Sequence, residues 1–311
     1  MDIRQMRYFI AISESPSLSV AASALGVAQP SLSQNVVRME EELGVRLLER
    51  SPRGTVLTDD GTLFLKHARM VCAAFDNCLD EMREVGEALR GKVSFGMPSS
   101  VSMVMSVPLA ETVRVEFPDL RLRAIEAMSG YIKTWIEDGT VDIGFIYDLS
   151  GADHFRTTHV LNERLFFFSA PDAWPLDTPP GTPVRLRDLQ KLELILPSPL
   201  HGLRKTIEGY AQPRGVKLNV TVEMDAMTQI KELVARGSGY AIFAPAAAHD
   251  FATRGDLVKS PICDPDMVRP VYLASNPARK SSRACRAIAQ VTLDVARDLV
   301  QRGIWEGELV T

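Results

Sequence analysis

Side chains that are apolar, with Ser13 as the exception, recur at helical spacing on three successive segments within the first 43 residues. Ser17 is a suitable N-cap for the second segment and Gly26 a suitable stop, while Pro30 falls in the first turn of the third, where a helix tolerates proline. The pattern predicts three helices, of which the last two are joined by a tight turn. Their faces are Met6, Phe9, Ile10 and Ser13; Leu18, Ala21, Ala22 and Leu25; and Leu32, Val36, Met39 and Leu43.

A hairpin and a long helix are expected next. Serine, proline and glycine separate short apolar runs between Arg50 and Val56, which is typical of a small β-hairpin, or wing. Thr58 can cap a helix that begins at Asp59, and Gly91 is expected to end it. One stripe follows this helix over roughly eight turns. It consists of Leu63, His67, Met70, Ala74, Cys78, Met82, Val85 and Leu89.

A helix this long and this striped needs a partner. The partner is either the same helix of a second subunit or another part of this chain.

After Gly91 the pattern changes to alternating strands and helices. Strands at 93–96, 120–127 and 141–147 alternate with helices at 101–117 and 131–138, the βαβαβ rhythm of a mostly parallel sheet. A second set follows, with strands in LFFFSAP, LELILP, KLNVTVEMDA and YAIFAP, helices near 203–211 and 228–236, a late strand VRPVYLAS and a terminal helix at 284–301.

The expected fold is therefore a multidomain α/β protein: an N-terminal winged helix-turn-helix, a long linker helix and a two-lobed α/β domain. The boundaries fall at residues 1–58, 59–90 and 91–311. Within the last domain, the first lobe takes about 91–164 and 270–311, and the second takes about 165–269, so the chain crosses twice between them.

Composition places the protein among soluble globular chains. It has 311 residues, of which 46% are hydrophobic and 24% charged. No run approaches the ~20 apolar residues of a membrane helix, and the start MDIRQMRYFI lacks the apolar core of a signal peptide. We expect a cytoplasmic protein without a membrane partner.

Motifs for catalysis and for cofactors are missing from the sequence. The five histidines form no HExxH pair, and neither a GxSxG elbow nor a GxxxxGK[ST] loop occurs. The four cysteines show no zinc or dithiol spacing, so we expect reduced thiols, with a redox switch of Cys263 and Cys285 as the alternative. We predict no enzyme, no metal and no cofactor.

Short polar side chains at the start of the third helix suit DNA. The first turn of a helix in the major groove points at base edges, where glutamine pairs with adenine and serine meets a base or a phosphate. Gln29, Ser31, Ser33 and Gln34 hold this position. The alternative is a helical hairpin whose polar residues face water. Arg50 and Arg53 on the wing are placed to reach phosphates or a minor groove.

Charge limits this DNA-binding surface. The whole chain has a net charge of -4, and six arginines are matched by six acidic residues through Thr58. Because neutralisation of phosphates supplies much of the affinity for DNA, a single copy should bind weakly. Two copies held together by the long helix would compensate.

These residues match a known family. The run SLSVAASALGVAQPSLSQNVVRMEEELGVRLLERSPRGTVLTDDG resembles the N-terminal domain of LysR-type transcriptional regulators. The segment from VSFGMPSS to DIGFIY resembles the first lobe of that family's effector domain, and RGSGYAIFAP resembles part of the second. Within the family, the first lobe looks most like regulators of nitrogen assimilation.

The resemblance implies a ligand-responsive transcription regulator that binds promoter DNA as a homodimer or homotetramer, with RNA polymerase as a further candidate partner. It also implies a periplasmic-binding-protein-like sensor of two lobes. Carried over by motif, the recognition-helix residues are Gln29, Pro30, Ser31, Ser33 and Gln34, and the wing residue is Arg53. The rival interpretation is a cytoplasmic solute-binding sensor without promoter specificity, which leaves the first 90 residues unexplained.

The effector should bind where strands end, because ligands of α/β sheets gather outside the carboxyl ends of the strands. Serine hydroxyls and helix N-termini favour a carboxylate, which Arg204 would neutralise, and the methionines and aromatic rings suit the body of an organic acid. The alternatives are N-capping serines, a surface arginine and ordinary core packing. The candidates are Ser99, Ser100, Ser102, Met128, Ser129, Tyr147, Ser198, His201, Arg204, Asp225, Met227, Phe243 and Pro245.

Overall fold

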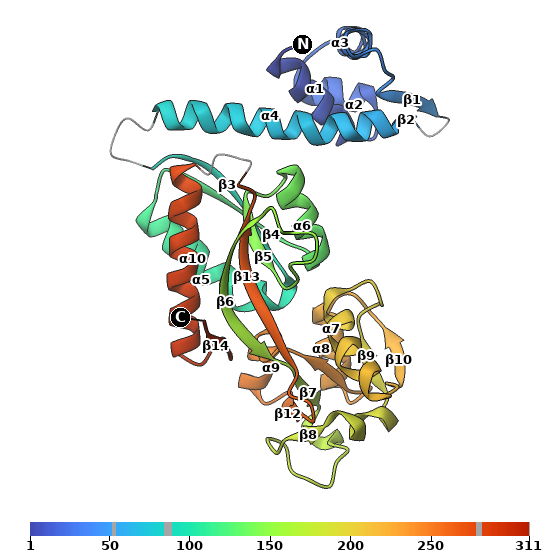
Figure 1. Cartoon of the computed structure of the whole chain (residues 1–311), viewed down its shortest axis with the longest axis vertical. Coiled ribbons are helices and arrows are strands. Elements are labelled where there is room, and N and C mark those ends of the chain that lie inside the picture. Colours follow the sequence, from blue (N-terminus) through green and yellow to red (C-terminus); the bar gives the residue numbers. More distant parts are fainter. Residues whose placement is uncertain (52–53, 84–88, 278–281, 311) are drawn as a thin grey trace. The chain divides into compact units, whose positions relative to one another are not determined.

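The structure is a computed structural model that describes residues 1–51, 54–83, 89–277 and 282–310 (Figure 1). It divides into two compact units. One consists mainly of Met1–Glu87, and the other of most of the chain from Ala88 onward. Each unit is described by itself below.

Three short helices form the core of the first unit: α1 (Ile3–Ser13), α2 (Leu18–Leu25) and α3 (Gln29–Leu43). The predicted ends are confirmed, since the Ser17 side chain accepts a hydrogen bond from the Val20 N–H, and Gly26 ends α2 in the left-handed region at φ +65°. Apolar side chains from all three helices meet in one cluster, as the helical pattern predicts. It contains Phe9, Ile12, Ala21, Ala22, Leu32, Val36, Met39 and Leu47.

The wing and the long helix follow as expected. Strands β1 (Leu48–Ser51) and β2 (Gly54–Leu57) pair antiparallel, and α4 spans Asp59–Arg83. Thr58 caps α4, because its Oγ1 accepts a hydrogen bond from the Gly61 N–H at 2.8 Å. One face of α4 packs Phe64 and Leu65 against the core of the three helices.

Several other apolar side chains of α4 are exposed. Leu63 is 56% exposed and Phe75 42%, with Val71 and Leu79 beside them. From the predicted stripe, His67, Ala74 and Cys78 are also exposed, and Met70 is half-buried. Val85 lies outside the described residues, and of Met82 only the backbone is described. The predicted helix end is wrong, because Leu89 is not helical and Gly91 opens a strand.

The second unit contains two lobes. Among the described residues, the first lobe holds a six-stranded sheet in the order β14-β6-β13-β5-β3-β4. Helices α5 and α10 cover one face, where Phe145 points, and α6 covers the other, where Ile146 points. The elements are β3 (Gly91–Met97), α5 (Ser99–Glu116), β4 (Leu120–Glu126), α6 (Ser129–Asp138), β5 (Ile143–Ile146), β6 (Arg156–Arg164), β13 (Val268–Ser275), α10 (Arg283–Gln301) and β14 (Glu308–Leu309).

The second lobe is built on a four-stranded sheet, in the order β11-β7-β12-β8, and a parallel β10-β9 pair, counted over the described part of the chain. A separate core fills it. Its elements are β7 (Phe166–Ser169), β8 (Val184–Arg185), β9 (Leu194–Leu196), α7 (Gly202–Ala211), β10 (Val220–Glu223), α8 (Met227–Ala235), β11 (Ala241–Phe243), α9 (His249–Arg254) and β12 (Val258–Cys263). The chain crosses between the lobes from β6 to β7 and from β12 to β13.

Four strands escaped the sequence analysis: β6, β8, β12 and β14. Two of them, β8 and β14, are only two residues long. The sequence of β6 is RTTHVLNER, in which polar residues interrupt the apolar pattern that predicts a strand. Its Val160 and Leu161 are buried in the core that the sheet forms with α5 and α10, which the local sequence does not show.

The described residues contain no helix long and apolar enough to cross a membrane. They also contain no group of three metal-ligating side chains, and the four cysteines, all within the described ranges, form no disulfide.

A substitution of Gly61 tests how closely α4 packs on the segment around Leu47 within the first unit. A Cβ at this position would lie 2.0 Å from the Leu47 carbonyl oxygen, so Gly61→Ala should destabilise the unit by about 1–3 kcal/mol through overpacking. Gly209→Ala is the matched control, because it places a Cβ in open space within α7. Calorimetry of the full chain should show a lower unfolding midpoint only for Gly61→Ala, and equal midpoints would contradict the described packing.

Candidate functional site

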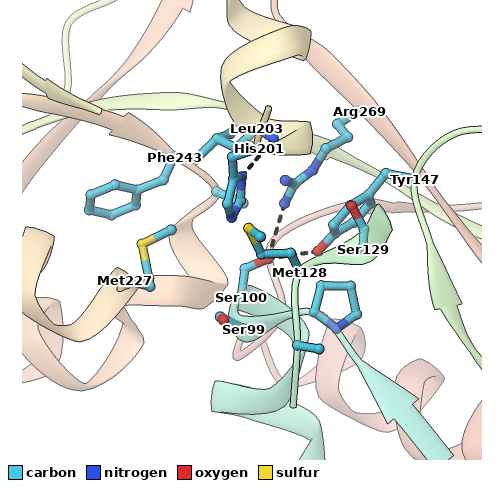
Figure 2. A pocket seen from close by; sticks show the side chains of 13 residues that line it. Ser99, Ser100, Met128, Ser129, Tyr147, His201, Leu203, Met227, Phe243 and Arg269 are labelled. Atoms are coloured by element: carbon cyan, nitrogen blue, oxygen red, sulfur yellow. Dashed lines mark hydrogen bonds between the residues drawn. The ribbon is translucent and has the colours of Figure 1, made fainter. Parts of the chain in front are cut away.

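A pocket opens in the second unit, where strand ends and helix starts from both lobes converge (Figure 2). Its free volume is about 20 Å³, which holds about one water molecule and is well below that of ordinary ligand pockets. The lining residues are Pro98, Ser99, Ser100, Ala127, Met128, Ser129, Tyr147, His201, Leu203, Met227, Phe243, Ala244 and Arg269. None of these thirteen is an acid.

Eight of the thirteen effector candidates line this pocket. They are Ser99, Ser100, Met128, Ser129, Tyr147, His201, Met227 and Phe243. The other five do not line it: Ser102, Ser198, Arg204, Asp225 and Pro245. The strand ends therefore predicted where the pocket lies, but they did not predict which side chains point into it.

Arg204 is held away from the pocket by its own neighbours. Its Nε donates to Glu208 Oε1 at 2.6 Å, and its Nη1 donates to the Pro197 carbonyl at 3.1 Å and to Glu223 at 3.4 Å. Glu208 and Glu223 neutralise its guanidinium, and Arg204 does not line the pocket where the sequence analysis expected it.

Asp225 and Ser198 form hydrogen bonds with each other and do not line the pocket. The Ser198 N–H and hydroxyl both donate to the Asp225 carboxylate, at 2.9 and 3.1 Å. These two hydrogen bonds lower the pKa of Asp225. The pair ties the loop before α7 to the segment before α8.

Arg269 is the cation of the pocket, and the sequence analysis missed it. It stands on β13 directly opposite Glu163 on β6, and its Nε and Nη2 donate to Glu163 Oε2 at 3.1 and 2.6 Å. The Trp305 indole holds the other carboxylate oxygen at 2.7 Å. The available signal was an arginine inside the apolar strand VRPVYLAS, since a charge buried in a strand needs a partner.

The Arg269 guanidinium also organises the hydroxyl groups beside it. Its Nη2 donates to Ser100 Oγ at 3.2 Å, and its Cζ lies 3.7 Å from the centre of the Tyr147 ring. Ser100 Oγ and Tyr147 Oη are 2.6 Å apart. Burial raises the pKa of Tyr147, although Arg269 opposes the shift, so the phenol is neutral.

The hydrogen bonds among Arg269, Ser100 and Tyr147 leave some of their hydrogen-bond donors free for a ligand. The Ser100 and Tyr147 hydroxyls carry two protons, of which their mutual hydrogen bond uses one, so one O–H remains. Arg269 Nη1 donates to no group within the described residues. Both groups lie on the polar side of the pocket, and Met227 and Phe243 lie on the other side (Figure 2).

His201 supplies another donor. Its Nδ1 accepts a hydrogen bond from the Leu203 N–H at 3.1 Å and so caps α7, which leaves the proton on Nε2. Burial lowers the pKa of His201, Asp225 opposes the shift and Arg269 adds to it. The ring is therefore neutral at pH 7.

The two lobes approach closely at the pocket. A Cβ on Gly202 would lie 2.8 Å from Ser129 Oγ, which puts the start of α7 beside the start of α6. The helix α5 has Pro98 as its N-cap, with no side-chain cap bond, so Ser99 and Ser100 are not N-capping serines. Helix starts at such a place offer unpaired N–H groups to a ligand.

The first unit presents the polar start of α3 to solvent. Gln29, Pro30, Ser31 and Gln34 are exposed and Ser33 is half-buried, while Leu32 and Val36 face the core. Ser19 Oγ donates to Gln29 Oε1 at 3.2 Å. Of the predicted wing residues, Arg53 lies outside the described residues, and for Arg50 only the backbone, in β1, is described.

Comparisons with known proteins place both units in one family. Residues 3–62 match the model "Bacterial regulatory helix-turn-helix protein, lysR family", and residues 86–297 match "LysR substrate binding domain". The chain is 28% identical over 309 residues to the nitrogen assimilation regulatory protein nac of Escherichia coli, which covers 98% of this chain and 99% of that protein.

Solved structures share the fold. A full-length variant of OxyR from Pseudomonas aeruginosa has a TM-score of 0.74 at 22% identity, covering 96% of this chain and 95% of that one. Full-length CbnR in complex with its target DNA has a TM-score of 0.65 at 22% identity, covering 96% and 99%. The predicted fold class is confirmed.

His201 predicts a pH dependence. Its pKa in the fold is lower than the ordinary value of 6.5, so the unfolded chain binds a proton first as the pH falls. The stability is complete above about pH 6.5 and declines below it until the folded group also titrates. His201→Asn keeps a side-chain cap but does not titrate. Thermal unfolding from pH 7.5 to 5 should show a smaller loss for this variant, and equal losses would refute the assignment.

Proposed function

This chain belongs to the LysR family and is a ligand-responsive transcriptional regulator that binds promoter DNA as an oligomer; we propose that its effector is a small organic anion bound in the pocket around Arg269. We propose further that it acts in the cytoplasm and catalyses no reaction. The relatives found in the comparison are regulators, which supports the second point.

One observation carries the choice of effector: the polar side of the pocket offers donors and no carboxylate. The donors are Arg269 Nη1, one hydroxyl of the Ser100 and Tyr147 pair, and His201 Nε2. Ser99 and Ser129 add hydroxyls that donate or accept. A carboxylate accepts several such bonds at once, whereas a cation or an amine would find few acceptors.

The rest of the pocket limits the effector to a small acid. Glu163 already neutralises most of the Arg269 charge, so the site suits a single carboxylate better than a polyanion. Met128, Met227 and Phe243 surround the space that remains. An apolar lining of this kind suits a short aliphatic or aromatic body, and the free volume of about 20 Å³ means that the lining side chains must move apart to admit it.

The first unit would read DNA with the exposed start of α3. Ser33 and Gln34 are proposed to contact base edges, as the recognition helix of a winged helix-turn-helix does. The exposed apolar side chains of α4 support the oligomer, because Leu63, Val71 and Phe75 would otherwise stay in water. A second copy of α4 would cover them.

The effector is tested by thermal unfolding of the full chain with a panel of aliphatic and aromatic carboxylates and their neutral amides. Binding raises the midpoint by mass action, so acids and not amides should act. Ser99→Ala with Ser129→Ala should weaken the binding of an active acid about 100-fold or more, since each of the two hydrogen bonds removed from a charged group costs roughly 1.5–3 kcal/mol.

Ser238→Ala is the control for the effector test, because Ser238 is an exposed serine of the second lobe that does not line the pocket. If only the amides raise the unfolding midpoint, or if the control variant loses as much of the response as the double variant, the effector does not bind at this pocket.

The DNA-binding role is tested with a duplex selected from a random pool by the full-length protein. Gln34→Ala and Ser33→Ala should each lower affinity for that duplex by roughly 5- to 100-fold, because a base contact contributes about 1–3 kcal/mol. Gln290→Ala, an exposed glutamine in the second unit, should change nothing. Sedimentation should show unchanged oligomers, and wild-type affinity in Gln34→Ala and Ser33→Ala would contradict the assignment.

A further inference from the structure

Several acidic side chains of the first unit are engaged by partners within it. Glu42 binds the N-terminal ammonium group at 2.7 Å, and Glu14 binds Arg69 at 3.0 Å. Glu40 accepts from two backbone N–H groups, those of Leu47 and Leu48, at 2.8 and 3.1 Å. A balanced formal charge therefore does not mean that every arginine is neutralised.

Two arginines of this unit have no ion-pair partner within the described residues: Arg4 on α1 and Arg38 on α3. By contrast, Arg7 pairs with Asp76. The Arg4 guanidinium is steadied by Tyr8, since its Nε donates to Tyr8 Oη at 2.7 Å and its Cζ lies 5.3 Å from the ring centre. Both unpaired arginines are exposed to solvent.

Arg4 and Arg38 line the same groove, between α1 and the start of α3. The other lining residues are Asp2, Gln5, Tyr8, Val27, Ala28, Ser31 and Asn35. Asp2 is the one carboxylate among them, and its Oδ1 accepts the Gln5 N–H at 2.8 Å as the cap of α1. The groove thus carries more positive than negative charge.

The start of α3 adds to this field. Ala28 is its N-cap and gives no side-chain bond, and Pro30 has no N–H. The N–H groups of Gln29 and Ser31 therefore find no acceptor among the described residues. Free N–H groups at a helix start attract phosphate oxygens.

We propose that this groove holds one phosphodiester of the DNA backbone, clamped between Arg4 and Arg38. The inference rests on the proposed DNA-binding role of the first unit and adds a contact that reads no sequence. A guanidinium binds two phosphate oxygens at once, and such contacts fix a protein's position on the duplex. Ser31 in the groove lies within one turn of Ser33 and Gln34, so the clamp sets where those two side chains meet the bases.

The test measures affinity of the full-length protein against salt, for the selected duplex and for a duplex of mixed sequence. Arg4→Gln and Arg38→Gln should each lower both affinities by the same factor, about 5- to 10-fold. The double variant leaves the phosphate without a cation and should also reduce the slope of log K against log salt by about 0.9. Arg7→Gln removes the same charge from an arginine that is already paired and should leave the slope unchanged.

Several outcomes overturn the proposal. An unchanged slope in the double variant shows that no phosphate is held there, and a loss confined to the selected duplex shows that the arginines read bases. Millimolar inorganic phosphate, compared with chloride at equal ionic strength, should not raise the unfolding midpoint. A rise that Arg38→Gln abolishes would mean a free-anion site instead of a DNA contact.

Two controls separate this inference from the proposed function. If the wild-type protein binds no duplex in a salt-dependent way, the DNA-binding role itself fails. Arg4→Lys keeps the charge but removes the forked geometry, so an intermediate affinity with an unchanged slope is expected. Arg4→Gln loses the hydrogen bond to Tyr8 and could unfold for that reason. In that case the affinities of Arg38→Gln for the two duplexes decide the question, because Arg38 contacts no aromatic ring among the described residues.

Discussion

The ion pair between Glu163 and Arg269 is the interaction on which the second unit depends. Both side chains are almost completely buried, at 0% and 4% exposure. Removing either partner would leave a charge in the interior, at a cost of about 3–5 kcal/mol. The pair also joins β6 to β13, the two strands at which the chain crosses between the lobes. The polar side of the pocket is thereby anchored where the lobes are connected.

The same pair gives the pocket its chemistry. Because Glu163 holds Arg269, the guanidinium stacks on Tyr147 and orients Ser100, and the remaining donors face the space between the lobes. Trp305, from beyond α10, holds Glu163 in turn. An anion that binds here meets a prearranged set of donors, which reduces the entropy lost on binding.

The first unit follows a different electrostatic rule. Its formal charge is balanced through Thr58, yet Glu40 and Glu42 are used within the fold, while Arg4 and Arg38 remain without ion-pair partners among the described residues. Local hydrogen bonding, and not net charge, therefore decides where a duplex would find positive groups. The glutamate cluster at the end of α3 stabilises the unit and does not form a repulsive patch of three free carboxylates.

The sequence by itself determined the helices of the first unit, its caps at Ser17 and Thr58, the α/β order of the second unit and the strand ends that form the pocket. These features depend on neighbours within one or two turns, so periodicity and capping residues report them directly. Tertiary structure alone decided that Arg269 and not Arg204 is the cation of the pocket. Glu163 and Arg269 are 106 positions apart and meet only through strand pairing, whereas Arg204 finds Glu208 four residues away, and a linear pattern shows neither long-range register nor the direction in which a side chain turns.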